Sequence, residues 1–111
     1  QAQERKTVAV QIVGHVYKPE QVPATEDRIR GLKVPAGFRV QRFAADLGKP
    51  RILAVAPDGA VYVTRPESGD LLMLRDTNND GVADQQTVVA KKPDLHGVAI
   101  DGNRVYLATI R

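Results

Sequence analysis

One stretch of the sequence has the residue types and spacing of a calcium-binding loop. Residues 76–84 read DTNNDGVAD, which matches the D-x-[DN]-x-[DN]-G core of such loops. Ca²⁺ binds several hard oxygen ligands. Alternate positions of this loop supply such oxygens, namely Asp76, Asn78, Asp80, the carbonyl of Val82, and Asp84. An EF-hand is not expected, because Thr87 stands where its bidentate glutamate belongs. We expect a cation that braces a hairpin; the alternative is a polar turn whose Asn and Asp suit the backbone.

His96 is the second residue with clear chemical potential. It precedes the apolar run 97–100, and Arg51 precedes a matching run at 52–56. An imidazole near neutral pH can accept a proton or hydrogen-bond a ligand, so His96 is the candidate catalytic base and ligand contact. The alternative is a histidine packed inside the fold and hydrogen-bonded to backbone. The sequence contains no Ser-His-Asp arrangement, phosphate-binding loop or dinucleotide fingerprint.

Arg51 and His96 occupy equivalent places in an internal repeat. Residues 51–55, RILAV, align with residues 96–100, HGVAI. Residues 57–63, PDGAVYV, then align with residues 101–107, DGNRVYL, so that the offset is 45 residues and later 44. Four-stranded propeller blades recur at about 40–50 residues. The repeat therefore predicts two successive blades that both begin with one of these polar residues.

Short strand-like runs separated by turn residues fill the chain from Phe38 onward. The predicted strands are 38–44, 52–56, 60–65, 71–75, 86–90, 97–100 and 104–109. Asp-Gly pairs at 58–59 and 101–102 lie between apolar runs and are strong hairpin signals. The expected fold class is therefore an all-β meander.

Together, the strands and the repeat predict a β-propeller fragment of about one and a half four-stranded antiparallel blades. The propeller portion spans 38–111, with blade one at 52–90 and a partial blade two at 96–111. The strand at 38–44 is expected to be the outer edge of a last blade that this sequence lacks. Blades bury their faces against neighbours, so we expect the open edges to pair with the remainder of a propeller or with another copy.

Residues 1–37 are expected to form an extended N-terminal leader. Prolines and glycines punctuate its second half, which favours an arm. Alternating apolar residues predict one strand at 8–13, and a helical turn is expected at 25–29 with Thr25 as its cap. A leader of this length is also an alternative cover for the open blade faces.

The chain resembles the soluble glucose/sorbosone dehydrogenases, six-bladed propellers that use pyrroloquinoline quinone (PQQ). The resemblance spans residues 31–111 and rests on "VPAGF", "AVAPDGAVYVT", "LRDTNNDGVAD" and "HGVAI". It implies periplasmic or secreted oxidation of a sugar alcohol or aldehyde by hydride transfer to PQQ. The catalytic role of His96 is not carried over, because glucose dehydrogenases of this family lack this spacing at their catalytic histidine.

In this family the cofactor and substrate bind at the axial mouth of the propeller, where the first residues of inner strands gather. Arg51, Arg65 and His96 are accordingly the candidate cofactor contacts, with Arg111 as a further arginine at a strand end. Arginine binds carboxylates through paired hydrogen bonds, and PQQ carries three carboxylates. The alternatives are a propeller that binds carbohydrate or protein without catalysis, and a lactonase-like calcium-dependent hydrolase.

Composition excludes several classes of partner and site. The net charge is +3, but the basic residues are scattered and are not interleaved with aromatic residues, so nucleic-acid binding is not expected. No apolar run is long enough for a membrane span. The absence of cysteine excludes disulfides and thiolate metal sites. The start at Gln1 without Met fits a mature end left by signal cleavage, in keeping with a periplasmic or secreted protein.

Overall fold

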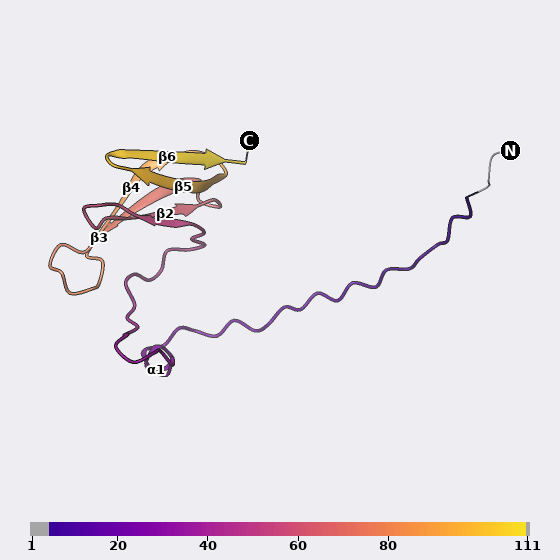
Figure 1. The fold of residues 1–111 in the computed structure, drawn as a ribbon, viewed down its shortest axis with the longest axis horizontal. Helices are drawn as coiled ribbons and strands as arrows, with labels where there is room; N and C mark the ends of the chain where they lie inside the picture. Colours follow the sequence, from indigo (N-terminus) through magenta and orange to yellow (C-terminus); the bar gives the residue numbers. More distant parts are fainter. Residues whose placement is uncertain (1–4, 111) are drawn as a thin grey trace.

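The computed structural model describes residues 5–110, and this part of the chain is mostly β-structure (Figure 1). It contains one short helix and six strands: α1 (Glu26–Arg30), β1 (Leu53–Val55), β2 (Val61–Arg65), β3 (Asp70–Arg75), β4 (Gln85–Lys91), β5 (Leu95–Asp101) and β6 (Arg104–Thr109). The first four strands form an antiparallel sheet in the order β1-β2-β3-β4, and β5 and β6 form a second, two-stranded antiparallel sheet. The predicted four-stranded meander is confirmed. These residues show no propeller.

Turn residues set where the strands begin and end. Between β1 and β2, the Asp58 carboxylate accepts a hydrogen bond from the Ala60 N–H at 3.1 Å. Gly59 has a φ of 86° there, a backbone conformation that side chains disfavour. The Ala60 N–H and then the Arg75 guanidinium hold the pKa of Asp58 below its usual range. The Asp-Gly signal in the sequence therefore marks a turn that its own side chain closes.

One face of the first sheet carries a small hydrophobic core. Val63 and Leu72 are opposite each other in the register of β2 and β3, and with Leu74 they form the buried cluster. The segment 43–47 covers this face, with Phe43 and Leu47 packed against the cluster. We call this segment the strap. It closes the first sheet on one side without being a strand itself.

The other face of the first sheet packs against the second sheet. Strand β5 lies against β1 and β2, and Leu95 at its start is fully buried. Thr64 is also fully buried: its hydroxyl accepts a hydrogen bond from the Ile52 N–H at 3.1 Å and donates to the His96 carbonyl at 2.9 Å. A single hydroxyl on β2 thus contacts the residue just before β1 and the first strand of the next sheet.

Two predicted strands are wrong. Residues 38–44 form no strand; they run as an irregular segment, and the Phe43 carbonyl accepts a hydrogen bond from the Ala83 N–H at 2.8 Å. Residues 8–13 are extended and exposed but pair with no other strand. Alternation alone does not make a strand, because a strand needs a hydrogen-bonded neighbour along its length, and neither segment is paired in a sheet.

The leader is otherwise as expected. The predicted helical turn is α1, and the Thr25 side chain accepts a hydrogen bond from the Arg28 N–H at its start. The leader runs away from the sheets (Figure 1), so it does not act as their cover. The radius of gyration is 21.4 Å, against about 13 Å for a compact domain of this length. Arg111, the expected end of the second blade, lies outside the described residues.

Thr64→Val tests the junction between the sheets. Valine has the same shape but leaves the Ile52 N–H and the His96 carbonyl without this partner, which costs about 1–3 kcal/mol when such groups are buried. We expect a lower free energy of unfolding by that amount in urea titrations followed by circular dichroism. Thr64→Ser keeps the hydroxyl and serves as the control. Equal stability of the Val variant and the wild type would contradict the assigned role.

Candidate functional site

The structure brings Arg51 and His96 together. The Nε of Arg51 donates a hydrogen bond to the Nε2 of His96 at 2.9 Å, across 45 residues of sequence. Arginine has only donors, so His96 accepts through Nε2 in this contact. The two candidate residues, equivalent in the repeat, are therefore direct partners at one end of the stacked sheets.

Thr64 positions both members of this pair. Its carbonyl accepts a hydrogen bond from the Arg51 N–H at 2.9 Å, while its hydroxyl donates to the His96 carbonyl. Because Thr64 is fully buried, its hydrogen bonds fix the backbone at Arg51 and at His96. The side chains of Arg51 and His96 project from this fixed base, with Arg51 exposed and His96 half-buried.

The Arg51 guanidinium is not neutralised within the described part of the chain. No carboxylate among residues 5–110 forms an ion pair with it. An exposed guanidinium held next to an imidazole offers planar, paired donors to a carboxylate or phosphate group. The chemistry that this arrangement supports is the binding of an anionic group.

Arg65, the other candidate cofactor contact, is placed differently. Its Nε and Nη2 donate to the two oxygens of Asp70 at 2.7 and 2.6 Å, and the side chains are only 16% and 9% exposed. The two residues are opposite each other in the β2–β3 register. The hydrogen bond that Arg65 donates to Asp70 raises the pKa of Arg65 above its usual value. A cofactor carboxylate at Arg65 would have to compete with Asp70.

The loop between β3 and β4 is organised by its own side chains. The Asp80 N–H lies 3.2 Å from Oδ1 of Asp76 and 3.3 Å from Oδ1 of Asn78. The Gly81 N–H donates to Oδ2 of Asp76 at 2.8 Å, and the Val82 N–H donates to Oδ1 of Asp80 at 2.9 Å. The side chains of three predicted calcium ligands thus accept hydrogen bonds from three successive backbone N–H groups, those of residues 80–82.

Asp84 stands apart from the other predicted ligands. Its Oδ2 accepts hydrogen bonds from the N–H and the hydroxyl of Thr77, at 3.0 and 2.7 Å, and so closes the base of the loop. Across residues 5–110, no three acidic or histidine side chains are placed to hold a metal ion together. A cation in this loop would therefore depend on the Asn78 oxygen and on carbonyls as much as on carboxylates.

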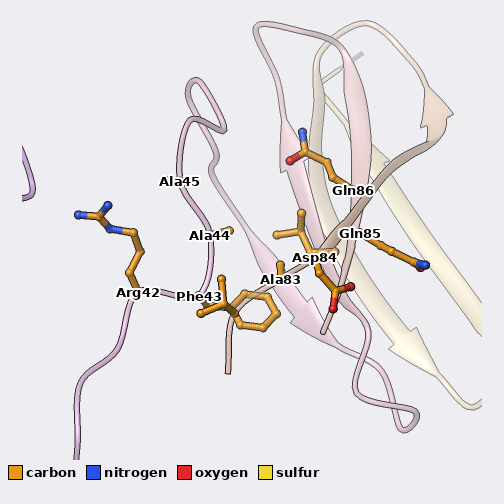
Figure 2. A pocket seen from close by; sticks show the side chains of 10 residues that line it. Arg42, Phe43, Ala44, Ala45, Ala83, Asp84, Gln85 and Gln86 are labelled. Carbon is orange, nitrogen blue, oxygen red and sulfur yellow. The ribbon is translucent and has the colours of Figure 1, made fainter. Parts of the chain in front are cut away.

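The sequence did not indicate Gln41, which ties the loop to the irregular segment just before the strap. Gln41 donates from Nε2 to the Asp80 carbonyl at 3.1 Å, and a Cβ on Gly81 would lie only 2.9 Å from the Gln41 side chain. Figure 2 shows Phe43 beside Ala83 and Asp84 at a cavity of about 280 Å³ between the strap and the sheet. The only signal for this contact was the polar-apolar alternation that predicted a strand at 38–44.

Arg65→Ala tests whether Arg65 is a structural residue. It leaves the Asp70 carboxylate with little solvent and without its guanidinium, and we expect a loss of about 3 kcal/mol in the free energy of unfolding. Arg75→Ala, which removes the exposed pair with Asp58, is the matched control and should have a much smaller effect. Denaturant titration compares the two, and similar losses would argue against a structural role specific to Arg65.

Comparison with known proteins adds no relative to this picture. No protein-family model, curated protein or solved structure matches the chain. Within the described residues, no helix is both long and apolar enough to cross a membrane. The Arg51–His96 pair and the loop at 76–84 are therefore the features of this chain that bear on its function.

Proposed function

We propose that this chain is the N-terminal portion of a propeller similar to the PQQ-dependent sugar and sorbosone dehydrogenases, with Arg51 and His96 at the cofactor end. In this proposal β1 to β4 are the first blade, and β5 and β6 begin the second. The complete protein would oxidise a sugar alcohol or aldehyde outside the cytoplasm. The chain alone supplies only part of the site and is not expected to catalyse the reaction.

The hydrogen bond between Arg51 and His96 is the observation that carries this proposal. The residues that open two successive repeats meet at one end of two packed sheets, and the first residues of inner strands lie near the axis in a propeller. A random pair of surface residues would not be expected to combine equivalence in a 45-residue repeat with direct contact. The pair therefore supports a shared binding role.

The residues present fit one carboxylate of PQQ. Arg51 has terminal nitrogens that no described carboxylate engages, and paired N–H donors suit a carboxylate. When bound, PQQ accepts the hydride of the substrate. His96 already accepts from Arg51 through Nε2, so it serves as a proton acceptor only if Arg51 turns away to bind the cofactor. The proposal thus assigns cofactor binding to Arg51 and makes the base role of His96 depend on it.

Titration of the chain with PQQ tests this assignment. We expect measurable binding by calorimetry, weakened about tenfold or more by Arg51→Ala, because a hydrogen bond to a charged group contributes about 1.5–3 kcal/mol. Arg104→Ala is the matched control. Arg104 is an exposed arginine paired with Asp101 in the register, at the opposite end of the β5–β6 sheet from His96. Equal affinities of the two variants would refute the assignment of Arg51, and binding of sugars without PQQ would favour a carbohydrate-binding propeller.

We also propose that the loop at 76–84 binds Ca²⁺ and braces the β3–β4 hairpin. Support comes from Asp76 and Asn78, whose oxygens both approach the Asp80 N–H. The ligands would be the side chains of Asp76, Asn78 and Asp80 with the Val82 carbonyl, the oxygen-rich set that Ca²⁺ prefers. Asp84 is committed to Thr77, which places it outside this set unless a water bridges it.

Calorimetric titration with millimolar Ca²⁺ tests the loop. Binding is expected in the wild type and should be lost in Asp76→Asn, which removes the charge of the first ligand. Asp101→Asn changes an exposed aspartate at a different turn and should bind like the wild type. Absence of binding heat with folded wild-type protein would reject the calcium proposal, and the loop would then be a self-closed polar turn.

A further inference from the structure

The first described part of the leader is an apolar segment that is exposed along its whole length. Residues 5–19, here called the arm, read RKTVAVQIVGHVYKP. Val8, Val10 and Ile12 are 79, 74 and 87% exposed, and no described residue hydrogen-bonds the backbone of the arm. Alternating β-branched residues favour a strand, and an exposed row of them gains by pairing with a sheet edge.

Strand β4 offers such an edge. It is seven residues long and pairs only with β3, at the end of the four-stranded sheet. Val88 and Val89 are 41 and 44% exposed, and no proline interrupts the strand. A long edge strand with unpaired peptide groups and exposed apolar side chains is a template for an additional strand. This edge is also the outer edge of the proposed blade, which the rest of a propeller would leave open.

Length and charge match the arm to this edge. The apolar segment 8–13 has six residues, close to the seven of β4. The arm carries Arg5, Lys6 and Lys18 and no acidic residue, whereas the adjoining loop 76–84 carries three aspartates and no basic residue. Parallel pairing places Arg5 and Lys6 beside the acidic loop. Antiparallel pairing would place them beside Lys91 and Lys92, and like charges repel at this range.

We propose that the arm of one copy of this chain adds to β4 of a second copy as a parallel fifth strand. The base of the arm is anchored on its own chain, since Arg42 hydrogen-bonds the Ala24 carbonyl and lies 3.3 Å from Glu26. From there the arm points away from its own sheets (Figure 1), and proline at 19 and 23 restricts the backbone to extended conformations. Reciprocal exchange between two copies closes a symmetric dimer.

Sedimentation of the full chain at micromolar concentration tests the dimer. We expect twice the 12.1 kDa mass of one chain, with dissociation as salt is raised, because the charge attraction is screened. Val10→Asp places a charge in the new strand and should yield the single-chain mass. Val22→Asp changes another exposed valine, which lies beyond the arm, and should leave the dimer intact. A wild-type chain that sediments as a monomer would overturn the proposal, as would a dimer that survives Val10→Asp.

Engineered cysteines identify the partner edge, since the chain has no cysteine of its own. Thr7→Cys and Gln85→Cys chains, mixed and oxidised, should form a covalent heterodimer through the parallel register. A Thr7→Cys and Lys91→Cys mixture is the antiparallel control and should remain largely uncrosslinked. Two results overturn the proposal: cross-linking only in the antiparallel mixture, and an intramolecular disulfide in a chain that carries both Thr7→Cys and Gln85→Cys, which would place the arm on its own β4.

Discussion

The hydroxyl of Thr64 is the contact on which the arrangement of the two sheets depends. It is buried. It accepts a hydrogen bond from the Ile52 N–H and donates one to the His96 carbonyl of the second sheet. A buried hydroxyl is tolerated only when it is satisfied, so the sheets cannot slide without leaving polar groups unpaired. The same residue sets the distance between Arg51 and His96, which makes the candidate site a by-product of how the sheets are joined.

The sequence was informative wherever structure is local. The repeat, the Asp-Gly turns and the Thr25 cap placed all six strands and α1, because hairpins and helix caps are determined by residues close in sequence. The segment at 38–44 could not be assigned correctly. Its Phe43 packs against the buried cluster of Val63, Leu72 and Leu74 without belonging to the sheet, and alternation does not reveal whether a neighbour supplies hydrogen bonds. The strand predicted at 8–13 was wrong for the same reason, because no neighbour pairs with this segment.

The candidate site, like the fold, could be predicted from the sequence only in part. The repeat placed Arg51 and His96 in equivalent positions, and the structure adds their direct contact. The pairing of Arg65 with Asp70 follows from the β2–β3 register, which the positions of the predicted strands alone did not provide. The link from Gln41 to the Asp80 carbonyl spans 39 residues and left no local signal. Contacts between segments that are distant in the sequence could therefore not be predicted.

The meander connectivity has a consequence for the order of folding. Each strand from β1 to β4 pairs with the next along the chain, so each hairpin closes a short loop at little entropic cost. The contact between Thr64 and His96 closes a loop of 32 residues. It is favourable only after the β1–β2 and β5–β6 hairpins have formed. During synthesis the first sheet can therefore assemble on its own. The Arg51 side chain has no His96 to contact until β5 has been made.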